Sequence, residues 1–118
     1  MDNSPIPQVT PAQLMEWMQT RPGLVLLDVR EPQEVTYARL DDPRVVYAPL
    51  SVLASRLQEA LPAAALDPQV ELVVFCHLGV RSAQVTAWLQ MQDYAHVYNL
   101  AGGLDAYAAQ IDPRIRRY

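Results

Sequence analysis

The stretch that decides the fold reads VELVVFC over residues 70–76 and HLGVRS over residues 77–82. Residues 70–76 are apolar and β-branched almost throughout, which predicts a strand buried on both faces rather than a strand with one face exposed to solvent. The segment SAQVTAWLQMQ (82–92) then places Val85, Trp88 and Leu89 at helical spacing. A buried strand that turns directly into a helix is typical of a parallel sheet.

The rest of the chain repeats this alternation. We expect further strands at 24–29, 44–50 and 96–100, and helices at 10–19, 51–61 and 104–111. Thr10 and Gln13 have the spacing of a capping box at the start of the first helix. The predicted fold is therefore α/β: a single open, mostly parallel sheet of about five strands with helices on both faces.

The length of 118 residues fits one domain with its own core. We expect a loosely ordered N-terminal segment at 1–9, where Pro5 and Pro7 lie, and one domain over 10–111. Residues 112–118 form a short basic tail that we expect to be solvated. Its arginines are Arg114, Arg116 and Arg117.

Composition excludes several classes of function. The net charge is −4 and all nine basic residues are arginines without a basic stripe, so no nucleic acid partner is expected. No apolar run approaches the ~20 residues of a membrane span, and the N-terminus does not resemble a secretory signal. One cysteine forbids an internal disulfide, which suggests a cytoplasmic location. Two scattered histidines and that cysteine predict no metal site, and we expect no cofactor.

Cys76 has two possible roles. A single free cysteine is often a small buried hydrophobic residue. This one, however, follows the strand predicted to be central, and open α/β sheets bind ligands beyond the carboxyl ends of their strands. A tight turn through Gly79 and a helix start would aim backbone N–H groups at the sulfur, with His77 and Arg81 nearby. We therefore predict that Cys76 is a nucleophile.

The number of residues between the cysteine and the arginine distinguishes two kinds of cysteine chemistry. Cysteine-dependent phosphatases have five residues between the cysteine and the arginine, whereas four separate Cys76 from Arg81. The smaller loop suits a sulfur atom carried on the thiolate better than a phosphoryl group.

Three motifs in order resemble the rhodanese family of sulfurtransferases. They are LLDVREPQE (26–34), CHLGVRS (76–82) and YNLAGGLDAY (98–107), which ends in Tyr107 where the family commonly has Trp. The resemblance implies that Cys76 carries a persulfide and that Arg81 is the second catalytic residue. His77, Leu78, Gly79, Val80, Arg81 and Ser82 would bind the substrate, and Asp28 and Arg30 would support the site.

The implied function is transfer of a sulfane sulfur from thiosulfate or a persulfide donor to a thiol, cyanide or a protein acceptor. A non-enzymatic sulfur relay or redox sensor is the alternative, and a small phosphatase or arsenate reductase is a further one. The basic tail and His96 lie outside every motif.

Overall fold

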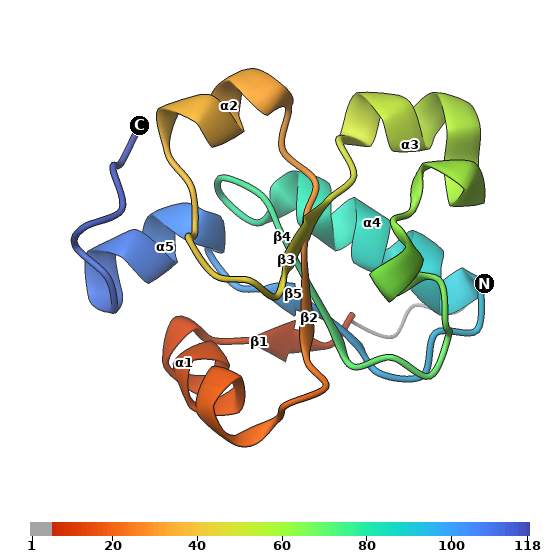
Figure 1. The fold of residues 1–118 in the computed structure, drawn as a ribbon, viewed down its shortest axis with the longest axis horizontal. Coiled ribbons are helices and arrows are strands. Elements are labelled where there is room, and N and C mark those ends of the chain that lie inside the picture. The colour runs from red at the N-terminus through yellow and green to blue at the C-terminus, as the bar shows by residue number, and fades with distance from the viewer. Residues whose placement is uncertain (1–5) are drawn as a thin grey trace.

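The computed structural model describes residues 6–118, and its centre is one five-stranded sheet in which every pairing is parallel (Figure 1). The strand order is β1-β5-β4-β2-β3, so β4 lies in the middle. The strands are β1 (Gln8–Val9), β2 (Val25–Asp28), β3 (Val45–Tyr47), β4 (Leu72–Phe75) and β5 (Val97–Leu100). The α/β prediction and the central place of the strand before Cys76 are confirmed.

Helices connect the strands within residues 6–118. They are α1 (Pro11–Thr20), α2 (Pro32–Tyr37), α3 (Leu50–Arg56), α4 (Val80–Met91) and α5 (Gly103–Gln110), with 3₁₀ turns η1 (Leu57–Ala60) and η2 (Ala63–Ala65). The capping box at α1 is present, and in it the Thr10 hydroxyl accepts a hydrogen bond from the backbone N–H of Gln13. No helix in this part of the chain is long and apolar enough to cross a membrane.

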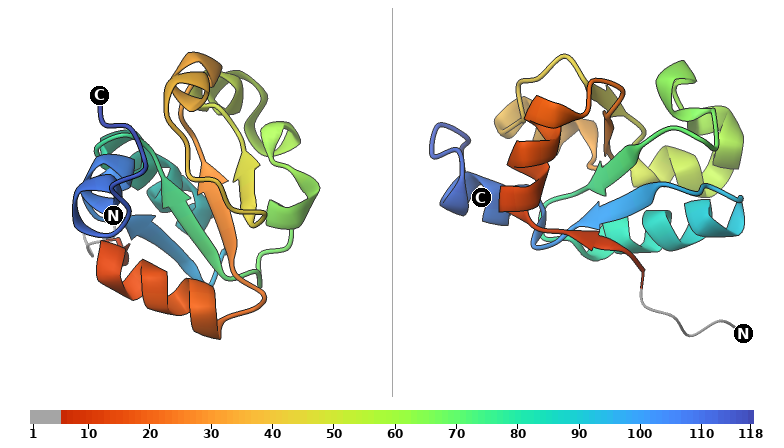
Figure 2. Two further views of the ribbon diagram at one scale, coloured as in Figure 1. Left: turned by 60° about the vertical axis from the view of Figure 1, so that its left-hand side comes forward. Right: turned by 90° about the horizontal axis from the view of Figure 1, so that it is seen from below.

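Helices cover both faces of the sheet, as Figure 2 shows from two sides, and a core of buried side chains lies on each face. On one face Leu14 of α1 and Leu104 of α5 pack against Leu26 of β2. On the other face Leu53 of α3 and Leu89 of α4 belong to the second cluster of buried side chains. Helices on both faces explain why β4 is apolar at every position.

Two elements differ from the sequence-based expectation. The helix expected at 51–61 ends at Arg56, because Leu57 has a φ of 53° and the chain continues as a 3₁₀ turn. Helix α2 was not predicted; Pro32 occupies its first turn and Glu31 with Glu34 forms its capping box. This helix stands at the carboxyl ends of β2 and β3.

A loosely ordered segment was expected at residues 1–9. Residues 1–5 lie outside the described residues. Gln8 and Val9 form an edge strand that pairs with Asn99 and Leu100 of β5. Val9 is fully buried, so this strand belongs to the domain rather than to a loose segment.

The tail was expected to be solvated, and its arginines are exposed, although the segment as a whole is attached to the domain. Arg114 and Arg117 are exposed but pair with Asp112 and Asp105, each at 2.9 Å. Ile115 is buried in the core cluster of α1 and α5, and this apolar anchor holds the segment on the domain. The chain therefore ends beside α2 and α5 (Figure 1).

Candidate active site

Cys76 lies directly after the central strand, and the loop that follows turns three groups toward its sulfur. The backbone N–H groups of Gly79 and Ser82 donate to Sγ at 3.1 and 3.4 Å. The Ser82 hydroxyl lies 3.2 Å from the same atom. Gly79 caps α4 with a φ of +96°, a conformation that glycine adopts without a steric cost. The two backbone amides thus aim their N–H bonds at the sulfur, whereas the Ser82 hydroxyl gives its proton to Asn99.

The turn at Gly102 and Gly103 supports this loop from behind. The amides of Leu104 and Asp105, at the start of α5, donate to the carbonyl oxygens of Cys76 and His77 at 2.9 and 3.0 Å. A Cβ at position 103 would collide with the His77 carbonyl. The close approach of α5 to the loop therefore requires glycine there.

Asn99 is a buried residue of β5 that was not among the predicted site residues. Its side-chain oxygen accepts from the Ser82 hydroxyl at 2.5 Å, and its Nδ2 donates to the Gly79 carbonyl at 3.2 Å. It therefore fixes both residues that donate to the Cys76 sulfur. An amide within the otherwise apolar run of β5 was the available signal, since buried polar groups require partners.

Arg81 is paired with a carboxylate on α2. Its two terminal nitrogens donate to the two carboxylate oxygens of Glu34 at 2.6 and 2.8 Å. These hydrogen bonds, against the effect of burial, lower the pKa of Glu34 to about 2 and raise that of Arg81. The pair therefore stays ionised at neutral pH. Glu34 lies in the quoted motif 26–34, but its contact could not be inferred across 47 positions.

Asp28 and Arg30 form a buried ion pair at the end of β2. Arg30 Nη2 lies 2.8 Å from Asp28 Oδ2, and Nε donates to both carboxylate oxygens. Arg30 Nη1 also donates to the Ala38 carbonyl at 2.7 Å. Burial works to lower the pKa of Arg30, but its hydrogen bonds to Asp28 and Tyr118 outweigh that and raise it. Among residues 6–118, neither side chain hydrogen-bonds to Cys76.

The remaining loop residues form the mouth of the site. A cavity of about 120 Å³ is lined by Cys76, His77, Leu78, Val80 and Arg81. Leu78 and Val80 are exposed and give this mouth an apolar rim. A larger polar hollow of about 670 Å³ lies between residues 36–41 and 112–116 and does not include the cysteine. Size alone therefore does not mark the reacting site.

Comparison with known proteins agrees with this geometry. The family description "Rhodanese-like domain" matches residues 10–110. A sulfurtransferase of Allochromatium vinosum is 31% identical over 85 residues, which cover 72% of each chain. The human single-domain sulfurtransferase TSTD1 superposes with a TM-score of 0.72 at 26% identity, covering 88% of this chain and 96% of the human one.

A longer relative contains the same unit. Rhodanese-like/PpiC domain-containing protein 12 of Arabidopsis thaliana, a chloroplastic protein, is 39% identical over 93 residues. The match covers 79% of this chain but 30% of the plant protein. The chain, with its loop from Cys76 to Arg81 at the end of a central parallel strand, belongs to the rhodanese-like domain family.

Proposed function

We propose that this protein is a sulfurtransferase that takes a sulfane sulfur from thiosulfate or a small persulfide and passes it to a thiol, cyanide or a protein acceptor. The observation that carries the proposal is the convergence of the Gly79 and Ser82 amides on the Cys76 sulfur. The same amides can stabilise a negative charge on an outer sulfur bonded to Cys76.

The reaction proceeds in two displacements. The Cys76 thiolate attacks the outer sulfur of thiosulfate, the bond to the sulfonate sulfur breaks, and sulfite leaves with the electron pair. The acceptor's thiolate or cyanide then attacks the outer sulfur of the Cys76 persulfide, and Sγ leaves as a thiolate. The second step requires another molecule, since the chain has one cysteine.

The dimensions of the site favour a small donor. The cavity of about 120 Å³ at the loop is smaller than the ~300 Å³ at which pockets for drug-sized ligands begin. Arg81 at its edge can attract an anion, and the loop is one residue shorter than that of phosphatases. These features favour thiosulfate over an aryl phosphate.

Incubation with thiosulfate is expected to add one sulfur, about 32 Da, to the protein as a covalent intermediate. Intact-mass spectrometry measures this addition, and cyanide is expected to remove it with release of thiocyanate. Cys76→Ser is the matched control and is expected to gain no mass. Sulfur uptake by this variant would contradict the mechanism. Hydrolysis of an aryl phosphate without sulfur uptake would favour the phosphatase alternative, and uptake only from a dedicated protein would favour the relay.

Arg81→Lys is expected to raise the Michaelis constant for thiosulfate about fivefold, because one ammonium group cannot hold the Glu34 carboxylate at two points and still offer N–H groups to the sulfonate, as the five N–H groups of a guanidinium can. The melting temperature is expected to change little, since Arg81 and Glu34 are both partly exposed. Steady-state kinetics with thiosulfate and a neutral persulfide donor measure the effect. Arg21→Lys, in the ion pair with Glu71, is the control. Equal losses with both donors would assign Arg81 a structural role.

A further inference from the structure

Tyr118 contacts both sides of the active-site loop. Its ring stacks on His77, the residue after the cysteine, with centroids 3.8 Å apart and an interplanar angle of 10°. Its hydroxyl lies 2.9 Å from Glu34 Oε2, and Glu34 holds Arg81 at the other end of the loop. One side chain from the tail therefore touches both His77, the first residue after Cys76, and Glu34, the partner of Arg81.

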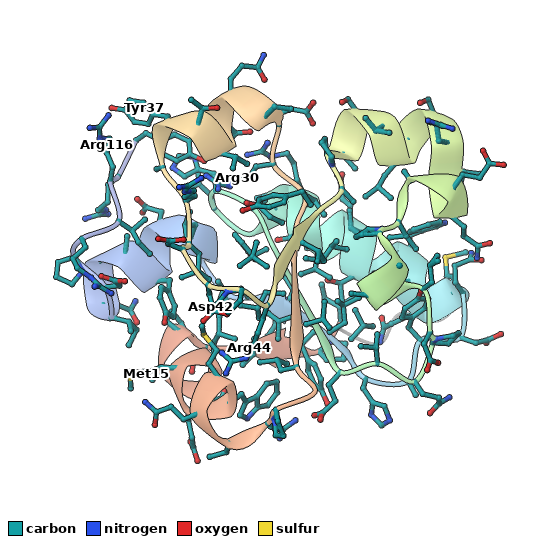
Figure 3. The ribbon with its side chains drawn as sticks, viewed as in Figure 1. Met15, Arg30, Tyr37, Asp42, Arg44 and Arg116 are labelled. Carbon is teal, nitrogen blue, oxygen red and sulfur yellow. The ribbon has the colours of Figure 1, made fainter. Side chains whose placement is uncertain are left out.

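The tail holds Tyr118 in place through several independent contacts. Ile115 is buried in the core, and Arg117 makes two hydrogen bonds to Asp105 on α5. The Arg116 guanidinium lies 4.8 Å from the centre of the Tyr37 ring, and Figure 3 shows these two labelled side chains together at the end of α2. The ring of Tyr37 also meets that of Tyr118 edge-on at 5.7 Å. The position of Tyr118 is thus fixed by the domain.

The direction of each hydrogen bond at the hydroxyl follows from its neighbours. Arg30 Nη1, 3.0 Å away, can only donate, so the Tyr118 oxygen accepts from it. The single hydroxyl proton is then given to the ionised Glu34. Burial raises the pKa of Tyr118, against the lowering effect of Arg30, so the hydroxyl keeps its proton at neutral pH. Tyr118 thereby joins the buried pair of Asp28 and Arg30 to the outer pair of Glu34 and Arg81.

His77 depends on the stacking for its position. Its Nε2 atom is buried and has no hydrogen-bond partner among residues 6–118. The Tyr118 ring lies nearly parallel to the imidazole. Loss of this ring would leave the His77 side chain free to change rotamer beside the reacting sulfur.

We infer that Tyr118 is a positioning residue for sulfur transfer, which holds Arg81 through Glu34 and holds His77 by stacking. The inference rests on the sulfurtransferase activity proposed above, and it assigns to the tail a part in binding the anionic donor. Tyr118 itself does not contact the Cys76 sulfur, so it acts through these two residues.

Two substitutions separate the contributions of the hydroxyl and the ring. Tyr118→Phe keeps the stacking and removes the link to Glu34, so the Michaelis constant for thiosulfate is expected to rise about threefold with an unchanged kcat. Tyr118→Ala also removes the stacking on His77, so the Michaelis constant is expected to rise and kcat is expected to fall. Tyr98→Phe is the matched control, since Tyr98 packs on Trp17 under α1. Unchanged kinetics in both Tyr118 variants would overturn the inference.

The stacking has a spectroscopic readout, because the chain has only two histidines. The ring current of Tyr118 is expected to shift the His77 Cε1 proton upfield, with His96 as the internal reference. This shift is expected to persist in Tyr118→Phe and to vanish in Tyr118→Ala. A His77 signal that is the same in Tyr118→Ala as in the unmodified protein would contradict the contact.

Alkylation tests the same inference without sulfur transfer. The rate ratio of the anion iodoacetate to neutral iodoacetamide at Cys76 reports how well Arg81 is held near the thiolate. This ratio is expected to fall about twofold or more in Tyr118→Phe and to stay constant in Tyr98→Phe. An unchanged ratio in Tyr118→Phe would refute the link to Arg81. If the unmodified protein took up no sulfur but the ratio fell as expected, the proposed function would fail and the positioning role would stand.

Discussion

Gly103→Ala is expected to abolish sulfur uptake and to lower the free energy of unfolding by more than about 2 kcal/mol. Gly103 has a φ of +65°, where a side chain is strained, and its Cβ would overlap the His77 carbonyl and lie 2.8 Å from the Cys76 carbonyl. Relief of this overlap requires α5 to move away from the loop. The hydrogen bonds from Leu104 and Asp105 to these carbonyls are then lost.

Urea denaturation and intact-mass measurement after thiosulfate treatment test both parts of this expectation. Gly23→Ala is the matched control, because a Cβ at that position meets no atom within 4 Å and its φ is not in the left-handed region. The control is expected to stay within about 1 kcal/mol of the unmodified protein. A Gly103→Ala protein with unchanged stability and full sulfur uptake would show that α5 does not position the loop.

The centre of the sheet could be predicted from the sequence because its signal is local. Continuous apolar runs mark β2 and β4, and helical spacing marks α1 and α4, so the strand–loop–helix unit at Cys76 is specified within about twenty residues. The edge strand β1 was missed because two residues carry too little pattern to be recognised. Its position depends on pairing with β5, some 90 residues later.

Unlike Asp28 and Arg30, the residues Glu34 and Tyr118 could not be predicted to lie at the site, because their contacts are long-range. Glu34 meets Arg81 across 47 positions, and Tyr118 meets Arg30 across 88. Charged and aromatic residues of these kinds occur on most protein surfaces, so their type alone does not single them out. Asn99 differs, because an amide within a buried strand is unusual enough to be noticed from the sequence.

Asp28→Asn is expected to lower the free energy of unfolding by about 3–5 kcal/mol, because it leaves a buried guanidinium without its counter-charge. The Arg30 side chain is fully buried and directs three of its hydrogen bonds at the Asp28 carboxylate. An amide keeps the shape of the carboxylate but turns an NH₂ group toward donors on Arg30. The cost therefore comes from charge and hydrogen bonding rather than from a cavity.

Removal of both charges separates this explanation from a simple loss of contact. In Asp28→Asn combined with Arg30→Met no buried charge remains, so the double variant is expected to be more stable than Asp28→Asn alone. Glu71→Gln breaks the half-exposed pair with Arg21 and is expected to cost less than about 1 kcal/mol. Chemical denaturation of all three variants measures these differences. A cost for Asp28→Asn no larger than that for Glu71→Gln would mean that Arg30 is stabilised mainly by the Ala38 carbonyl and Tyr118.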